Sequence, residues 1–205
     1  MAGFDIAETS DLSVMETRCW ELLASGAKSS KSPMHLVVVG TPQGSIARMR
    51  TVVLRRVDID TKKIYFHTDV RSAKTADIEK TGLLSWLAYD GLQRSQLFLS
   101  GKTVVHHMDA LCRHHWSDTQ HFSRRCYLLP EGPGRPLEDS DAYIDDALAG
   151  FQYSLEASEK GFEHFAVVET TADRMEWYYT FGRGNKRAEF HYEHGILQSA
   201  CWLTP

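Results

Sequence analysis

The chain has 205 residues, of which 42% are hydrophobic and 24% charged, as expected for one globular domain spanning 1–205. Its formal net charge of −4 excludes a general attraction to nucleic acid, so an anion site needs locally clustered cations. No apolar run approaches the about 20 residues that span a bilayer, and the first residues lack the pattern of a secretory signal. The cysteines show no CxxC spacing, so we expect a cytoplasmic protein whose thiols are reduced and buried as small hydrophobes: Cys19, Cys112, Cys126 and Cys201.

The first third of the chain combines one helix with strand-like runs. Apolar residues from Leu12 to Leu23 recur at helical spacing, and Ser10 or Asp11 can cap the helix that we expect over 10–26. Strands are expected over 35–39, 45–57 and 63–68, separated by the turns 40–44 and 58–62. This order is typical of antiparallel strands joined by hairpins.

The remainder of the chain adds more strands and a few helices. Helices are expected over 72–80, 109–117 and 140–158, and the segment 130–136 is too rich in Pro and Gly to be anything but a loop. Further strands are expected over 83–89, 95–105, 162–169, 174–180, 187–192 and 195–203. The pattern predicts a mainly β protein, a closed or nearly closed antiparallel barrel with peripheral helices, and not a doubly wound parallel sheet.

Cationic and hydroxyl side chains gather on two neighbouring strands and the turn after them. The runs Arg50–Arg55, Ile64–Asp69 and Ser72–Lys74 supply the donors that a phosphate needs. A helix starting at Ser72 adds free N–H groups and the positive end of its dipole. Arg50 and Arg55 are five positions apart, so both serve one site only if the strand twists, bulges or ends between them.

These residues resemble the pyridoxamine 5′-phosphate oxidase family of FMN-binding split barrels. The motifs that carry the resemblance occur in order from about Arg50 to Val105: Arg50–Arg55, Phe66–Asp69, Ser72–Lys74, and Gln96 five residues before Gly101. The terminus Cys201–Pro205 is similar to the family's Leu-x-Pro ending. The resemblance implies an antiparallel split β-barrel, FMN as cofactor, and a homodimer with the flavin site at the subunit interface.

The resemblance also implies a role for individual residues. Arg50, Ser72 and Lys74 would hold the FMN phosphate. The backbone of Thr51, Val52, Val53 and Leu54 would run along the isoalloxazine ring, with Arg55 near its polar edge. His67 and Thr68 would line the ribityl or phosphate region, Gln96 would come from the partner subunit, and Trp177 or Tyr178 would stand beside the flavin.

The chain departs from the family pattern where the substrate is recognised. Ala73 stands where the family has a phosphate-binding Arg, and Arg71 is a candidate substitute. The segment 185–189 lacks the family's Arg-x-His pair, and the segment 114–125 has no clear match to the Tyr, Arg and Ser that grip the substrate phosphate. We therefore expect an FMN-dependent oxidoreductase that acts on an unassigned small molecule, with no assigned catalytic residue and no nucleic-acid or membrane partner.

Other interpretations of the same residues stay open. The chain could be a non-catalytic flavin carrier or sensor, a deazaflavin-dependent reductase or a haem-binding split barrel. Trp177 and its neighbours could form barrel core and dimer interface, and Arg50, Arg55 and Lys74 could be solvated surface residues. No metal site is expected from the histidine-rich segment 106–121, because its ligands lack a repeated spacing, and we expect these histidines at the surface or an interface.

Overall fold

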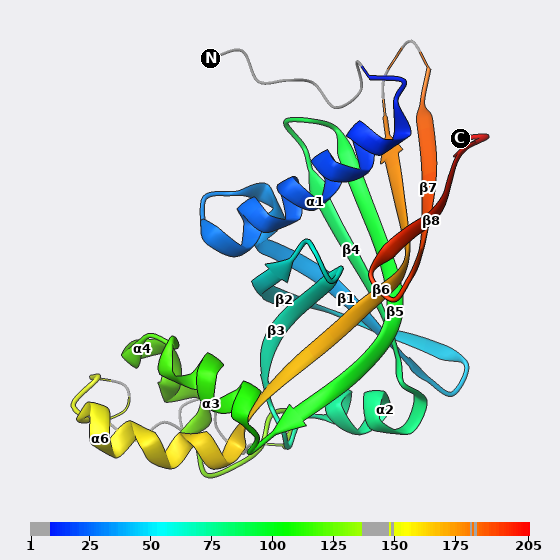
Figure 1. Ribbon diagram of the computed structural model, residues 1–205. Coiled ribbons are helices and arrows are strands. Elements are labelled where there is room, and N and C mark those ends of the chain that lie inside the picture. Colours follow the sequence, from blue (N-terminus) through cyan, green and yellow to red (C-terminus); the bar gives the residue numbers. More distant parts are fainter. Residues whose placement is uncertain (1–8, 137–147, 149, 181, 183) are drawn as a thin grey trace.

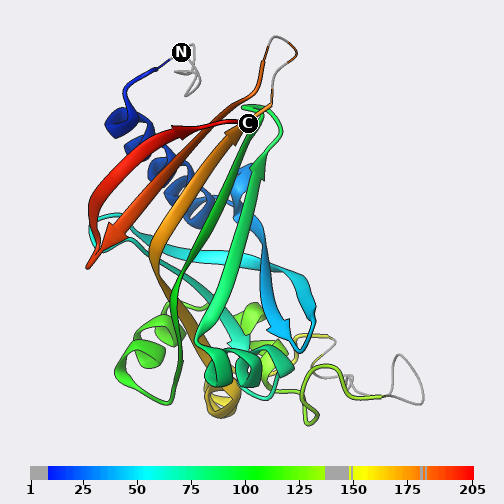
Figure 2. The same ribbon diagram turned by 90° about the vertical axis from the view of Figure 1, so that its right-hand side faces the viewer.

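The computed structural model describes residues 9–136, 148, 150–180, 182 and 184–205 (Figure 1). Its strands pair antiparallel in the order β3-β2-β1-β4-β5-β6-β7-β8. Because β3 also pairs with β6, the strands from β3 to β6 close into a barrel, and β7 and β8 extend outward from β6 (Figure 2). The strands are β1 (Leu36–Gln43), β2 (Ile46–Asp58), β3 (Lys63–Asp69), β4 (Leu83–Asp90), β5 (Ser95–His107), β6 (Phe165–Tyr179), β7 (Lys186–Glu193) and β8 (Ile196–Leu203). The predicted mainly β barrel is confirmed.

Strand β6 is shared between the barrel and its extension. The sequence predicted two strands over 162–169 and 174–180, which was wrong: one continuous strand pairs with β3 through its first half and with β7 through its second. Its partner β5 changes register between Ser100 and Gly101. A Cβ on Gly101 would lie 2.0 Å from the carbonyl oxygen of Thr171, so only glycine permits this close approach of two backbones.

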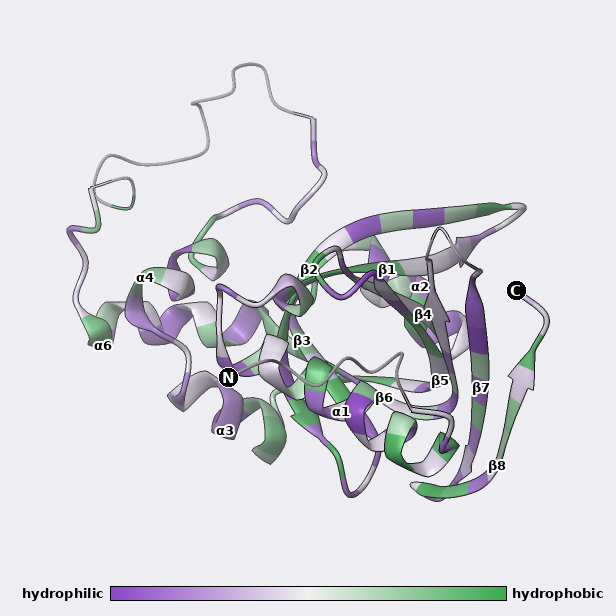
Figure 3. Cartoon of the chain, turned by 90° about the horizontal axis from the view of Figure 1, so that it is seen from above, coloured by the Kyte–Doolittle hydropathy of each residue, from purple (hydrophilic) through white to green (hydrophobic). Residues whose placement is uncertain are grey.

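Helix α1 (Leu12–Lys28) lies across one end of the barrel (Figure 3). The Asp11 carboxylate accepts the N–H groups of Ser13 and Val14, which confirms the predicted helix and identifies its cap. Trp20 and Leu23 on its apolar face belong to the barrel core. The other helices are α2 (Ala73–Thr81), α3 (Ala110–Ser117), α4 (His121–Arg124) and α6 (Leu155–Ser158), with the 3-10 segments η2 (Pro33–His35), η3 (Arg125–Tyr127) and η4 (Glu159–His164).

Two predicted boundaries were wrong. Strand β1 runs on to Gln43, and the turn is at Gly44 and Ser45; Pro42 is accepted because β1 pairs with β4 only as far as Gly40. Nine of the 19 residues of the helix predicted over 140–158 lie outside the described residues. Within them Phe151 has a φ of +56°, and a regular helix resumes only at Leu155.

A second apolar cluster lies outside the barrel, between the outer face of β3 and β6 and helix α3. Its members are Tyr65, Cys112, Trp116, Tyr127, Phe162, Phe165 and Val167. Cys19 and Cys112 are buried as expected, whereas Cys126 and Cys201 are exposed, so the prediction of four buried thiols was half wrong. No helix in the described ranges is both long and apolar enough to cross a membrane.

Candidate functional site

Four of the predicted residues meet at one rim of the barrel, and we call Arg50, Thr68, Ser72 and Lys74 the cation cradle. The Lys74 ammonium donates to the Thr68 hydroxyl at 2.9 Å, and that hydroxyl lies 3.3 Å from the Ser72 hydroxyl. Arg50 enters from β2 and donates to Thr41 Oγ1 at 2.8 Å, while Thr41 donates to Asp77 of α2. Strands β1, β2 and β3 and the start of α2 thus present cations and hydroxyls to one place.

Both cations of the cradle have lowered pKa values. Burial lowers the pKa of Lys74, and the Arg50 guanidinium lowers it further. Burial likewise lowers the pKa of Arg50, with Arg48 adding to the effect. Partly buried cations that repel one another are stabilised by an anion placed between them.

The start of α2 adds to the cradle. Ser72 is the N-cap, as predicted, yet its side chain makes no capping hydrogen bond and instead faces Thr68. The N–H groups of the first turn therefore lack a side-chain acceptor within the described residues. Together with the helix dipole they favour an anion at this position.

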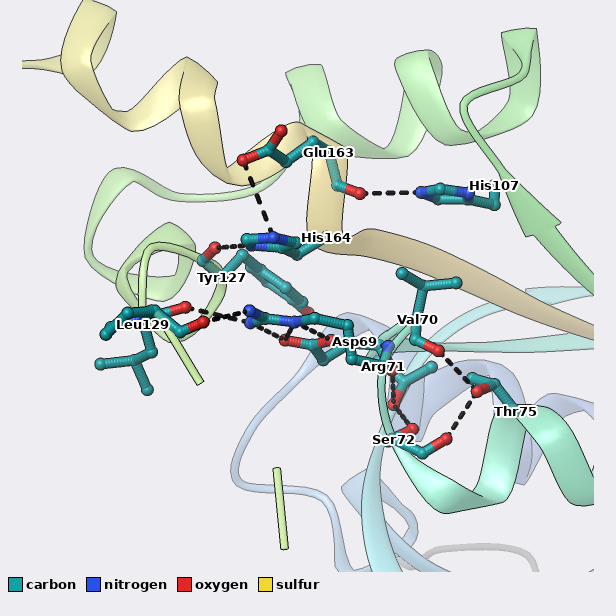
Figure 4. A network of polar contacts seen from close by, with 12 residues as sticks. Asp69, Val70, Arg71, Ser72, Thr75, His107, Tyr127, Leu129, Glu163 and His164 are labelled. Carbon is teal, nitrogen blue, oxygen red and sulfur yellow. Dashed lines mark hydrogen bonds and ion pairs between the residues drawn. The ribbon is translucent and has the colours of Figure 1, made fainter. Parts of the chain in front are cut away.

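Arg71 does not join the cradle. Its Nε and Nη2 donate to the Asp69 carboxylate at 3.0 and 2.6 Å, and Nη1 and Nη2 also donate to the carbonyl oxygens of Pro130 and Leu129 (Figure 4). The guanidinium thus neutralises the buried Asp69 and ties the end of β3 to the loop after η3. Arg71 is a structural residue in this chain, and the suggestion that it replaces the family's phosphate-binding Arg receives no support from its contacts.

Val53, Arg55 and His67 lie elsewhere, on the outer face of β2 and β3. A register shift between Leu54 and Arg56 shows the bulge that the spacing of Arg50 and Arg55 required, but the two arginines still serve different faces. Arg55 lines a pocket of about 600 Å³ between β2, α1, α3 and α4. The pocket is bounded by Ala27, Lys28, Ser30, His35, Val53, Arg55, Arg56, His67, His114, His115, Asp118, Thr119, Gln120, Phe122 and Ser123.

Along Thr51–Leu54 of β2, the main chain is more available to a ligand than the side chains are. The Leu54 side chain is fully buried in the barrel core, and Val52 packs against that core. Thr51 is exposed. A ligand lying along Thr51–Leu54 therefore meets the strand's main chain and the Thr51 and Val53 side chains.

His67 and Thr68 were predicted to line one region, but as neighbours on a strand they point to opposite faces. Thr68 joins the cradle, and His67 Nε2 lies 2.9 Å from His115 Nδ1 of α3. Burial, the imidazole of His115 and Arg55 lower the pKa of His67 to about 2. Burial, Arg56 and His114 lower the pKa of His115 to about 4. Both rings are therefore neutral at pH 7.

His115 is the residue of this group that sequence reasoning missed. It was placed with the other histidines at a surface or interface, whereas it is 5% exposed and packs against Tyr65. Its i, i+3 relation to the buried Cys112 on one face of α3 was the available signal. Other histidines of the segment have separate partners: His106 contacts Asp109 and His107 contacts the Glu163 carbonyl oxygen. The described residues contain no group suited to hold a metal ion.

Trp177 and Gln96 lie away from the cradle. Trp177 is fully buried in the barrel, donates to the Ser95 hydroxyl at 3.1 Å and stacks on Tyr179. Its position therefore agrees with the alternative interpretation, in which Trp177 is part of the barrel core. Its side chain cannot reach a ligand at the surface. Gln96 pairs with Tyr89 and Tyr178 on the outer face of the sheet.

That outer face carries an apolar groove. A pocket of about 510 Å³ lies between the β1–β2 hairpin and β4, and its lining includes Val38, Leu87 and Phe98. Its rim is unusually apolar for a surface: Ile46 is 67% exposed and Met49 62%. Gln96 and Phe98 are two positions apart on β5, so both side chains face this side of the sheet.

The closed antiparallel barrel with peripheral helices places the chain in the split-barrel class of folds. A sequence model of the family described as "Pyridoxamine 5'-phosphate oxidase, FMN-binding domain" matches residues 18–107, so the resemblance found in the motifs is confirmed over that range. No curated protein matches the chain.

Two solved structures have the same architecture. A pyridoxamine 5′-phosphate oxidase-related, FMN-binding protein from Nostoc punctiforme PCC 73102 is similar with a TM-score of 0.73 and 19% identity, over 92% of this chain and 96% of that one. PhzG from Burkholderia lata 383, solved with tetrahydrophenazine-1-carboxylic acid, has a TM-score of 0.69 and 15% identity, over 100% of this chain and 98% of its own. At these identities the likeness establishes the fold, a pyridoxamine 5′-phosphate oxidase-like split barrel.

Proposed function

We propose that the chain is an FMN-binding oxidoreductase whose cation cradle holds the phosphate of the cofactor. The observation that carries the proposal is that two partly buried cations lie near the start of a helix: burial lowers the pKa of both Arg50 and Lys74, and the Arg50 guanidinium lowers the pKa of Lys74 further. The family match over residues 18–107 supports FMN as the source of the phosphate.

The donor set fits a phosphate monoester. Arg50 offers a planar pair of N–H groups, Lys74 a point charge, Thr68 and Ser72 hydroxyls, and α2 its first-turn N–H groups. Asp69, whose charge raises the pKa of Lys74, is neutralised by Arg71, so Asp77 of α2 is the one acid that acts on Arg50 and Lys74 without such a partner among the described residues. The cradle therefore keeps an excess of positive charge for an anion.

The remainder of the cofactor would lie along the edge of β2 that β3 leaves unpaired before Leu54, because from this edge a ligand can reach Arg50 on one face of the strand and Arg55 on the other. The main chain of Thr51–Leu54 would offer polar groups along this edge, and Arg55 would stabilise negative charge at its far end. Bound FMN supplies hydride or electron transfer, and the chain positions it and tunes its electrostatics. The pocket of about 600 Å³ beside Arg55 has the size of a small-molecule site.

We also propose a homodimer. Gln96 faces the apolar outer side of the sheet from β5, which is not one of the elements that form the cradle, so we assign it to the site of a second copy. Ile46 and Met49 would be covered by that copy. Met49→Asp should shift the assembly to monomer in light scattering; an unchanged dimer would exclude this face.

The function is tested by the cofactor that the protein carries. Purified protein should be yellow and release FMN on denaturation, and the stripped protein should bind FMN more tightly than riboflavin, which lacks the phosphate. Arg50→Met should remove that preference. A colourless protein that ignores added FMN would refute the proposal. Oxygen consumption with a panel of small amines then separates an oxidase from a flavin carrier.

A further inference from the structure

The His67–His115 pair holds two neutral imidazoles in one hydrogen bond. The bond joins His67 Nε2 to His115 Nδ1 at 2.9 Å, and the two rings stand nearly perpendicular at 81°. Phe165 packs edge-on against His67 on another side, so the ring has little freedom to turn. A single proton lies between the two nitrogens, and the surroundings decide which ring owns it.

The surroundings assign the proton to His115. Its other nitrogen, Nε2, is buried without a hydrogen-bond partner among the described residues. If Nε2 carried the proton, a buried N–H donor would go unsatisfied, which is rarer in folded proteins than an unsatisfied acceptor. If Nε2 is the bare nitrogen, only an acceptor is left unsatisfied, which is the milder of the two outcomes. His115 therefore carries its proton on Nδ1 and donates to His67.

This assignment fixes the other ring as well. A neutral His67 that accepts at Nε2 must carry its own proton on Nδ1. Among the described residues Nδ1 has no hydrogen-bond partner, and it is not one of the fully buried unsatisfied atoms. Because His67 lines the pocket of about 600 Å³, this N–H can donate a hydrogen bond to a molecule bound in that pocket. The pair ends at the unpartnered Nε2 of His115, so it cannot pass a proton onward and serves as a fixed donor.

We propose that His115 is a positioning residue that holds His67 as a neutral Nδ1–H donor, there to hydrogen-bond an oxygen acceptor of the small molecule bound beside Arg55. The proposal rests on the pocket being the substrate side of the proposed flavin site. It names the substrate class by its chemistry: a molecule with a carbonyl or carboxylate oxygen that can lie between a neutral imidazole N–H and the Arg55 guanidinium. Val53 and Phe122 line the same pocket and suit an apolar ring on that molecule.

The tautomer can be measured directly, without turnover. Long-range ¹H–¹⁵N spectra of the full FMN-loaded chain, with labelled histidine, should show His67 protonated at Nδ1 at neutral pH. His115→Asn keeps an N–H where Nδ1 stood and should keep this spectrum. His115→Phe keeps a ring but removes the donor, and His67 should shift toward the Nε2–H form.

Benzoate is the probe for the ligand. It should move the His67 Nδ1–H signal saturably in the wild type and in His115→Asn, and bind at least tenfold more weakly to His115→Phe. A wild-type His67 protonated at Nε2, a signal that benzoate does not move, or equal binding by the Phe variant would each overturn the proposal. Should the Phe variant not fold, the wild-type tautomer and the Asn variant still decide. FMN retention in the same samples reports on the proposed function separately.

Discussion

Replacing Lys74 by Met tests the cradle most directly. A unit charge pair about 4 Å apart gains about 4 kcal/mol at an effective dielectric constant of about 20, and desolvation leaves a net contact of about 1.5–3 kcal/mol. The dissociation constant of FMN should therefore rise about 10- to 150-fold. Riboflavin affinity should hardly change, because riboflavin has no phosphate. Fluorescence titration of the stripped protein with both flavins measures the difference.

The Lys74→Met substitution should raise the free energy of unfolding of the stripped protein or leave it unchanged. Lys74 is partly desolvated and close to Arg50, so its ammonium opposes folding when no anion is present. Thr68 keeps Ser72 as a partner after the substitution. Lys80→Met, on the exposed last turn of the same helix, is the matched control and should leave both flavin affinities unchanged. An FMN affinity unchanged in the Lys74 variant, or an equal loss in the Lys80 variant, would refute the reasoning.

The remaining predictions concern stability. Arg71→Ala should destabilise the protein by about 3–5 kcal/mol by leaving the buried Asp69 carboxylate unpaired, and Asp69→Asn added to it should restore most of the loss in urea unfolding; no rescue would contradict the ion-pair explanation. Gly101→Ala should be strongly destabilising and Gly91→Ala close to neutral, because the added Cβ meets backbone at 2.0 Å in the first case and a side chain at 3.6 Å in the second; equal melting temperatures would disprove this. His115 has a pKa lowered to about 4, below the usual value of 6.5, so its contribution to stability is complete above pH 6.5 and is lost as the pH falls toward 4. His115→Phe should flatten that part of the stability profile, and an unchanged slope would mean that other groups cause it.

Local chemistry made much of the fold predictable. Short β-type runs between turns predicted the strands of the barrel, and helical spacing after Asp11 predicted α1. What the sequence concealed depends on contacts between distant segments. Nothing in 162–180 shows that one strand changes partners from β3 to β7, since the pairing is decided by segments far along the chain.

The candidate site likewise contains residues whose positions could be predicted from the sequence and residues whose contacts could not. Arg50, Ser72 and Lys74 were predicted together, because the hairpin and the start of α2 bring near neighbours in sequence to one rim. The role of Arg71 could not be read, because its partners Leu129 and Pro130 come from a remote loop. His115 was concealed for the same reason: its contact with His67 exists only once α3 has packed on the outside of the barrel.

The pairing of β3 with β6 has a consequence for synthesis. On the ribosome β1, β2 and β3 emerge early, but the edge of β3 stays without its neighbour until β4, β5 and the helical segment have followed and Phe165–Thr171 appears. Nearly half of the 205-residue chain, from Asp69 to Phe165, is therefore translated while this strand edge is unpaired, which is a state prone to mispairing. Barrel closure is a late, long-range event, so we expect the nascent chain to depend on chaperones mainly before β6 has been synthesised.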